Sequence, residues 1–320
     1  MAKRLELLAE DAELRHTPYS NDLRVELIER MTAATADTPP LEFQVQYAVE
    51  LLRAGRSEDA VREVDRITGL LERDPRYSTP RNKRQLRRLK AISHLRIGEQ
   101  ENCILDHTID SCLLPIRGRG IHRLQRGSRA AVEVYHDLLE EDPGDLSSRW
   151  LMNIGYMTLG EYPEGVPPRW LVPPSVFVPE YEIERFPDVA PGAEVAQLST
   201  SGGSAVEDFN GDGYLDVATS SWSPTDPLRY FENRTDGRFA DRTGAAGLTG
   251  LTGGINLEHA DYDNDGRPDL LVLRGAWLGE LGVYPNSLLR NLGGSFEDVT
   301  ERAGILSFAP SHSAAWGDYD

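Results

Sequence analysis

Apolar residues in the N-terminal half recur every three to four positions, a spacing that places them on one face of a helix. Residues 44–52 and 61–70 show this spacing most clearly. Between them, Gly55 is expected to end the first helix and Ser57 to cap the start of the second. The pattern therefore predicts a helical hairpin.

Further units of helix, glycine turn and helix are expected around Gly98 and Gly160. Residues 130–143 carry the spacing found in the second helix of the tetratricopeptide repeat. Residues 1–165 are therefore predicted to form a tetratricopeptide-like (TPR-like) helical domain. An irregular helical domain that only packs against the rest of the chain is the alternative.

The pattern changes after residue 165. Seven prolines between residues 167 and 191 exclude a continuous helix, and residues 166–185 are predicted to form a Pro-rich linker. Short runs bounded by turn residues then predict strands at residues 203–209, 215–220, 229–233, 255–262 and 270–274.

A longer repeat runs through this second half. The pattern Phe-x-Asp recurs at Phe186, Phe239 and Phe296, with offsets of 53 and 57 residues. A unit of about 55 residues with four short strands is the size of one β-propeller blade. Residues 186–320 are therefore predicted to form propeller blades, in a multidomain chain that is α-helical first and β second.

Two stretches of this half, residues 208–216 and 261–269, share the acidic pattern D-x-[DN]-x-D-G-x-x-D, and a third copy begins at Asp318. Side-chain oxygens at positions 1, 3, 5 and 9, a backbone carbonyl at position 7 and a glycine turn make a loop that wraps a hard cation. The expected ligands, with a carbonyl at the two position-7 residues Tyr214 and Arg267, are Asp208, Asn210, Asp212, Tyr214, Asp216, Asp261, Asp263, Asp265, Arg267, Asp269, Asp318 and Asp320.

Calcium is the expected cofactor, because a flexible loop with several protein oxygens suits its coordination shell better than that of magnesium. The second loop has four carboxylates and the first has three, which predicts tighter binding at the second. The alternative is an acidic hairpin, held by Asx turns, that binds no metal.

The formal charge of −18 is concentrated in the same half: residues 171–320 carry 9 basic and 24 acidic residues, a net of −15, against 25 and 28, a net of −3, in residues 1–170. Such a field attracts divalent cations and repels nucleic acid and anionic membranes, so no nucleic-acid partner is expected. No apolar run approaches about 18 residues, so no membrane span is expected either.

Basic residues cluster at positions 81–90 and 117–129. Neither cluster has the interleaved aromatic residues of a nucleic-acid site, and solvated helix faces explain them, the first by pairing with the acidic blades. The chain contains no P-loop, G-x-S-x-G or H-E-x-x-H motif, so no catalytic residue is predicted.

The two cysteines, Cys103 and Cys112, are compatible with one disulfide in an exported protein. A metal cluster with His107 and His122 is a second interpretation, although the paired C-x2-C spacing of zinc sites is absent. Two buried thiols are the third.

The acidic loops and the Phe-x-Asp series together resemble the FG-GAP/VCBS repeat family, the calcium-loop blades of integrin α-chain propellers. Residues 253–256, 271–275 and 285–291 more narrowly resemble the cartilage acidic protein-like group that carries an ASPIC/UnbV domain. In bacterial members of that group, helical repeats precede the blades. The resemblance implies calcium-binding blades in an exported protein, periplasmic or extracellular.

Two features depart from this pattern, because no signal peptide can be read at the N-terminus and the third loop stops at residue 320. About two and a half blades cannot close a ring of at least four, so a fragment with an incomplete propeller is expected. The expected function is non-catalytic binding of a protein or glycan partner, with calcium stabilising the blade loops. An exported enzyme or enzyme accessory is the alternative.

Overall fold

A computed structural model describes residues 1–14, 20–34, 39–74, 77–104, 108, 110–111, 113–181, 183 and 186–318 of the chain. These residues form two compact units. The helical unit spans Pro18–Pro187, and the blade unit combines Met1–Thr17 with Asp188–Asp320. Among the described residues, no helix has both the length and the apolar character needed to cross a bilayer.

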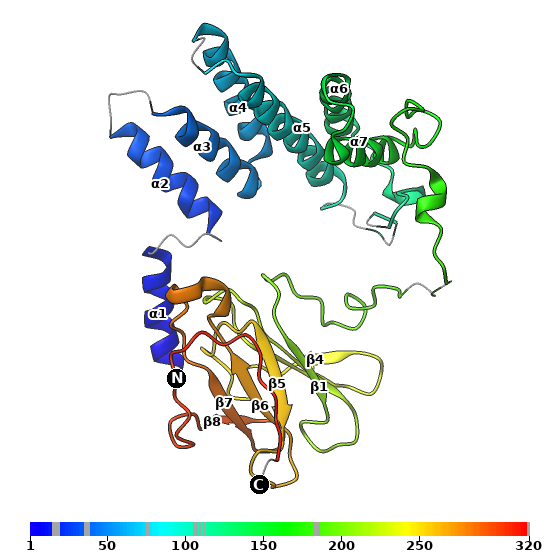
Figure 1. Ribbon diagram of the computed structural model, residues 1–320. Helices are drawn as coiled ribbons and strands as arrows, with labels where there is room; N and C mark the ends of the chain where they lie inside the picture. Colours follow the sequence, from blue (N-terminus) through cyan, green and yellow to red (C-terminus); the bar gives the residue numbers. More distant parts are fainter. Residues whose placement is uncertain are drawn as a thin grey trace. The chain divides into compact units, whose positions relative to one another are not determined.

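Six α-helices lie in the described part of the helical unit, and each packs mainly against its neighbours in the chain (Figure 1, blue to green). They are α2 (Asn21–Ala33), α3 (Leu41–Arg53), α4 (Ser57–Arg73), α5 (Pro80–Asn102), α6 (Arg126–Glu141) and α7 (Leu146–Leu159). The predicted helical hairpin at residues 44–70 is confirmed as α3 and α4. Ser57 is the first residue of α4 rather than its N-cap, a position that Arg56 occupies without a side-chain capping bond.

Gly98 does not form the predicted turn, because it lies inside α5. A Cβ atom on Gly127 of α6 would lie 2.5 Å from the Gly98 nitrogen and 2.6 Å from the His94 carbonyl oxygen. The two glycines therefore let α5 and α6 approach closely. Gly160 does end a helix, with a left-handed φ of 73° after α7, but the segment that follows it is not helical.

The first part of the Pro-rich segment belongs to the core of the helical unit. Val166 and Trp170 are buried with residues of α5, α6 and α7. Arg149 of α7 donates to the Trp170 carbonyl at 3.1 Å, and Asn153 donates to the same oxygen at 2.9 Å. The helical core therefore continues past residue 165, the limit that the sequence suggested.

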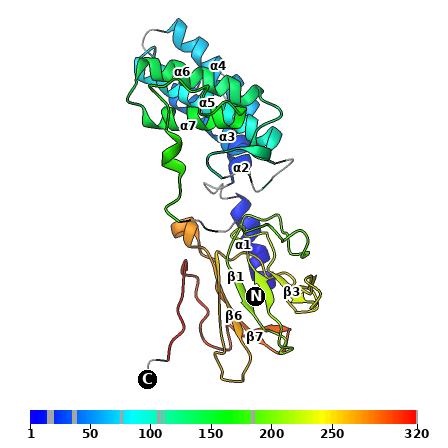
Figure 2. The same cartoon turned by 90° about the vertical axis from the view of Figure 1, so that its right-hand side faces the viewer.

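Two four-stranded antiparallel sheets lie in the described part of the blade unit, each with its strands in chain order. Strands of both sheets, among them β1 and β6, are labelled in Figure 2. The first contains β1 (Ser204–Glu207), β2 (Asp216–Thr219), β3 (Arg229–Asn233) and β4 (Phe239–Asp241). The second contains β5 (Asn256–Ala260), β6 (Asp269–Leu273), β7 (Ser287–Asn291) and β8 (Phe296–Asp298). All five predicted strands are confirmed, and the Phe-x-Asp segments at 239 and 296 form the fourth strand of each sheet.

A single apolar core joins the two sheets. Phe209, Tyr230 and Phe296 meet edge to face, with ring centroids 5.7 to 6.1 Å apart. Phe209 lies in the loop between β1 and β2, Tyr230 in β3 and Phe296 in β8, so the third phenylalanine of the Phe-x-Asp series fills the space between the two sheets.

The first Phe-x-Asp copy does not form a strand, and Phe186 is 88% exposed. The turn that follows it nevertheless repeats the turns after β4 and β8. In all three, the nitrogen of one residue donates to the carbonyl five positions earlier, in the pairs Val195 to Ala190 (3.1 Å), Leu248 to Thr243 (3.1 Å) and Ile305 to Thr300 (3.2 Å). The repeat therefore extends upstream of β1 as a turn.

These turns also link successive repeats. The Phe239 nitrogen donates to the Ala193 carbonyl at 3.0 Å, and the Phe296 nitrogen donates to the Ala246 carbonyl at 2.8 Å. Ala193 and Ala246 occupy equivalent turn positions, 53 residues apart. The turn at residues 190–195 thus meets the first sheet as the turn at 243–248 meets the second.

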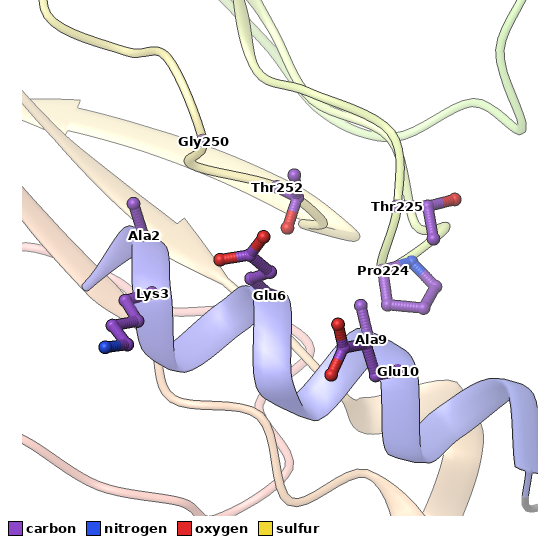
Figure 3. Close-up of a pocket in the computed structure, with 9 residues that line it drawn as sticks. All are labelled: Ala2, Lys3, Glu6, Ala9, Glu10, Pro224, Thr225, Gly250 and Thr252. Carbon is purple, nitrogen blue, oxygen red and sulfur yellow. The ribbon is translucent and has the colours of Figure 1, made fainter.

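Helix α1 (Ala2–Leu14) packs on the sheets, although the sequence placed it in the helical domain. Leu5 is 2% exposed and belongs to the core of the two sheets, and Arg4 pairs with Glu301 at 2.8 Å. A cavity of about 530 Å³ lies between α1 and the loops after β2 and β4 (Figure 3). It is lined by Ala2, Lys3, Glu6, Ala9, Glu10, Pro224, Thr225, Gly250 and Thr252.

Candidate metal centre

The two acidic loops occupy the same place in their sheets, residues 208–216 between β1 and β2 and residues 261–269 between β5 and β6. Their backbones turn alike. Positions 4 and 6 are left-handed in both, with φ of 77° at Gly211, 87° at Gly213, 58° at Asn264 and 84° at Gly266. Glycine adopts this conformation freely and asparagine more readily than most residues, which is why the pattern places them here.

Asp208 organises the first loop. Its carboxylate accepts from the backbone nitrogens of Gly211 (2.8 Å), Asp212 (3.1 Å) and Gly213 (2.8 Å). Asn210 Oδ1 accepts from the Asp212 nitrogen at 3.0 Å, and Asn210 Nδ2 donates to Asp212 Oδ2 at 3.0 Å. The side chains at positions 1, 3 and 5 are therefore held together by the loop itself.

Asp261 plays the same part in the second loop, where it accepts from the nitrogens of Asp265 (2.9 Å) and Gly266 (2.8 Å). Asp265 accepts from the Arg267 nitrogen at 3.0 Å. Carboxylate oxygens of Asp261, Asp263 and Asp265 all lie within 4.8 Å of one another. Three of the predicted ligands are thus gathered at one point.

This cluster fits calcium. Calcium binds oxygen ligands at about 2.3 to 2.6 Å, so ligands on opposite sides of the ion are about 5 Å apart. The separations in the second loop lie within that limit, and Asp261 and Asp263 keep partial contact with solvent, which leaves an entry path. The donor set is all oxygen, the type that calcium prefers over softer metals.

The position-9 aspartates lie deeper than the other predicted ligands. Asp216 is fully buried; its Oδ1 accepts from the Asn233 nitrogen at 2.8 Å and its Oδ2 from the Tyr230 hydroxyl at 2.7 Å. Burial is the main cause that raises the pKa of Asp216, and burial together with this hydrogen bond raises the pKa of Tyr230. Asp216 therefore ties the loop to β3.

Asp269 repeats this arrangement in the second sheet. It is fully buried, with Oδ1 accepting from the Asn291 nitrogen at 2.7 Å and Oδ2 from the Tyr262 nitrogen at 3.0 Å, and burial raises its pKa. Asn291 in turn donates through Nδ2 to the carbonyls of Phe209 (2.8 Å) and Pro268 (3.0 Å). Phe209 belongs to the first loop, so this amide connects the two loops.

The structure adds two residues that the ligand pattern did not single out for their side chains. Arg290 of β7 lies with Nε 2.7 Å from Asp263 Oδ2 and Nη2 3.0 Å from Asp265 Oδ2. Arg267, predicted only as a carbonyl ligand, donates through Nη2 to Asp265 Oδ2 at 2.6 Å. An alignment of the two repeats at Asn233 and Asn291 pairs Arg290 with Glu232, so the sequence does show a reversal of charge at this position.

The charge of these arginines acts on the loop. Burial by itself would raise the pKa of Asp265, but hydrogen bonds from the Arg290 guanidinium and the Arg267 nitrogen outweigh it, and the pKa lies below its usual range. At position 7 of the first loop, Tyr214 is 51% exposed. The roles of the Tyr214 and Arg267 carbonyls as ligands stay predictions. In the third copy, Asp318 is exposed and Asp320 lies outside the described residues.

The predicted cysteine pair falls partly outside the described residues, because Cys112 and His107 are not among them. Cys103 Sγ lies 3.6 Å from Nε2 of His122, which is buried with a lowered pKa, and His122 Nδ1 lies 3.0 Å from Ser128 Oγ. Burial is the main cause of that shift. The disulfide and the metal cluster therefore both stay predictions.

Three arginines of the first basic cluster pair with acids of their own unit, and the predicted pairing of this cluster with the acidic blades stays a prediction. Three arginines of α5 reach the end of α6 and the start of α7, in the pairs Arg84 with Asp142 (3.0 Å), Arg87 with Glu141 (2.6 Å) and Arg88 with Asp145 (2.7 Å). In the second cluster, Arg126 pairs with Glu58 and Glu101, and Arg129 with Glu161.

Residues 208–272 match the family profile of the FG-GAP-like repeat. The match begins at the first ligand position of the first loop and runs through the second loop into β6. A comparison with curated protein sequences finds no match. The matched segment is thus similar to FG-GAP-like repeats, with a helical region before it and four-stranded sheets around it.

Proposed function

We propose that this protein is a calcium-stabilised binding protein without catalytic activity, whose blade unit takes part in recognition of a protein or glycan. The observation that carries the proposal is the cluster of Asp261, Asp263 and Asp265 oxygens within 4.8 Å, inside a segment similar to the FG-GAP-like repeat. Repeats of this kind suggest an interaction or adhesion domain. Calcium is proposed for both loops because their backbones turn alike.

The metal has a structural part in this proposal. Three or four carboxylates a few ångströms apart repel one another, and a bound divalent cation relieves that repulsion. Calcium supplies positive charge and oxygen coordination when bound. The chain supplies the rest: Asp208 and Asp261 hold the loop backbones, while Asp216 and Asp269 tie each loop to the third strand of its sheet.

We further propose that the two sheets are blades of a β-propeller. Their strand order follows the chain, they share one core, and the turn at residues 190–195 repeats the turns that follow both fourth strands. A turn of this kind upstream of β1 supports a further blade of which residues 186–195 are the outer edge. The stacked helices of the other unit support the TPR-like assignment, and together with the blades they support the ASPIC/UnbV-associated group.

An export route is part of the same proposal. FG-GAP-like repeats are typical of exported proteins, and solvent-exposed calcium loops suit the weak affinities of extracellular modules, about 10⁻⁴ to 10⁻³ M. Calcium at such concentrations is available outside the cytoplasm. Fractionation of cells that make the protein tests this, with recovery in the cytoplasmic fraction alone as the contrary result.

Calorimetric titration of the metal-free chain with calcium tests the central proposal. We expect saturable binding, with magnesium at the same concentration giving much less heat because it sheds water reluctantly. The double substitution Asp261→Asn with Asp265→Asn should abolish binding at the second loop. No saturable calcium binding by the folded chain contradicts the proposal, and turnover of a substrate would contradict its non-catalytic part.

A further inference from the structure

The two acidic loops share a backbone but differ in what faces their carboxylates. Arg290 of β7 contacts two predicted ligands of the second loop, Asp263 at 2.7 Å and Asp265 at 3.0 Å. The equivalent position in the first sheet is Glu232, because Asn233 and Asn291 hold equivalent places in β3 and β7. The guanidinium group of Arg290 therefore faces the second loop, whereas the equivalent residue of the first sheet, Glu232, carries a carboxylate.

A second arginine adds to this contrast. Arg267 bonds Asp265 through Nη2 at 2.6 Å and also donates through Nε to the Asn291 carbonyl at 3.1 Å, so its guanidinium is fixed at both ends. The first loop has the neutral Tyr214 at this position, half exposed. Counting side chains, the second loop has four carboxylates and two guanidinium groups, a net of −2, whereas the first has three carboxylates and a net of −3.

Resting on the proposed calcium binding, we propose that Arg290, assisted by Arg267, is a built-in counter-cation of the second loop and regulates its affinity. Calcium must compete there with a guanidinium for the same oxygens of Asp263 and Asp265. The second loop then keeps its charge balance without metal, and the first loop is the stronger and more calcium-dependent site. This order is opposite to the one that the number of carboxylates predicts.

The arginines and calcium would use the same carboxylate oxygens of the second loop. Asp265 Oδ2 accepts from both arginines, and Asp263 Oδ2 forms an ion pair with Arg290 Nε at 2.7 Å. These are side chains at ligand positions 3 and 5, which calcium needs. Both aspartates are partly shielded from solvent, with 23% and 17% side-chain exposure, so water screens the guanidinium less than it screens a pair at the open surface.

The test is calcium titration calorimetry on chains with one loop disabled. Asp208→Asn with Asp212→Asn leaves only the second loop, and Arg290→Gln in that background should tighten calcium binding by about three- to tenfold, the range expected for removing one or two partly exposed ion pairs. Arg302→Gln is the matched control. It removes the same charge from the same unit, but from a pair with Glu297 at 2.9 Å, and should change the affinity by less than about twofold.

A converse variant guards against failure of Arg290→Gln to fold. With the second loop disabled by Asp261→Asn and Asp265→Asn, Glu232→Arg should weaken calcium binding at the first loop by about three- to tenfold. If neither loop of the parent chain binds calcium, the proposed function fails. If the parent binds calcium but Arg290→Gln binds no tighter than Arg302→Gln, or Glu232→Arg has no effect, the counter-cation role is overturned.

Discussion

The helical unit and the blade unit use their acidic residues in different ways. In the helical unit, acids near the end of α6 and the start of α7 meet arginines of α5, as in Arg87 with Glu141 and Arg88 with Asp145. In the blade unit, Asp208 and Asp261 instead accept from backbone nitrogens of their own loops. In the helical unit, each of these acids is neutralised by the guanidinium group of a neighbouring arginine. In the blade unit, the loops gather several carboxylates at a point that solvent can reach.

The two units should therefore lose stability through different substitutions. Exposed ion pairs contribute little and are screened by salt. Asp269 should contribute more, because its loss leaves the buried Asn291 nitrogen without an acceptor. A cation should therefore stabilise the blade unit selectively.

The largest effect is expected from Asp269→Ala. The substitution removes the acceptor of two backbone nitrogens, at Asn291 and Tyr262, and should destabilise the blade unit by about 3 to 4 kcal/mol at neutral pH. The urea dependence of hydrogen exchange in peptides from β5 to β8 measures this loss of stability. Asp263→Ala, at an exposed ligand position, should cost under about 1 kcal/mol in chelator. Equal costs for the two variants would contradict the distinction between anchoring and ligating aspartates.

A packing substitution should act on the helical unit alone. Gly127→Ala places a Cβ 2.5 Å from the Gly98 nitrogen and should cost about 2 to 3 kcal/mol, because α5 and α6 must move apart. Gly69→Ala in α4 is the control, since nothing lies within 4 Å of its added Cβ, and it should stabilise by about 0.5 to 1 kcal/mol through helix propensity. Circular dichroism at 222 nm during urea unfolding separates these outcomes, and a harmless Gly127→Ala would refute the close approach.

Acid should act in opposite directions on two buried carboxyl groups, Glu50 of the helical unit and Asp269 of the blade unit. Burial alone would raise the pKa of Glu50, but hydrogen bonds from Asn21 and Arg24 outweigh it and lower that pKa. The stability that Glu50 contributes is therefore present above its unfolded pKa of about 4.3 and is lost as pH falls through the lower folded value.

For Asp269, burial raises the folded pKa above the unfolded value of about 3.9, so its ionisation costs stability at neutral pH. That cost disappears as pH falls from the folded pKa to the unfolded one. In chelator, wild type should gain stability relative to Asp269→Asn as pH falls from neutral to the unfolded pKa of about 3.9. Wild type should lose stability relative to Glu50→Gln as pH falls below about 4.3. If acidification changed the stability of wild type in the same direction relative to both variants, the opposite roles of Asp269 and Glu50 would be contradicted.

The smallest effect is expected from a surface ion pair of the helical unit. Arg87→Ala breaks a pair whose side chains are 32% and 45% exposed, and should cost about 0.5 kcal/mol or less in low salt. Arg88→Ala should cost more, because its partner Asp145 is nearly buried and also caps α7. Thermal melts at low and high sodium chloride check this, and a large salt-independent loss in Arg87→Ala would be contrary to it.

Much of this structure could be predicted from local sequence. The periodic apolar positions indicated α3 and α4, and the Phe-x-Asp copies at 239 and 296 mark β4 and β8. The acidic pattern indicated three side chains that do meet, those of Asp261, Asp263 and Asp265. Each of these features depends on residues close together in the chain, which is why a pattern reveals it.

The features that the sequence did not reveal depend on distant contacts. Gly98 resembles a turn glycine until α6 is packed against it through Gly127, and α1 resembles any amphipathic helix until Leu5 enters the core of the sheets. Arg290 is separated from its aspartates by a strand and a long connection, so ligand spacing alone could not indicate it. Tertiary packing decides these cases, and local propensity does not.

Hydrogen exchange followed by mass spectrometry, in calcium and in chelator, tests the central claim most directly because it reads both units in one experiment. We predict that calcium slows exchange by about tenfold or more in peptides spanning β1 to β3 and β5 to β7, as binding to the native state requires. Peptides from α2 to α7 should exchange at the same rate in both conditions. Unchanged exchange in the sheets, or an equal slowing in both units, would contradict the claim that calcium stabilises the blade unit through its acidic loops.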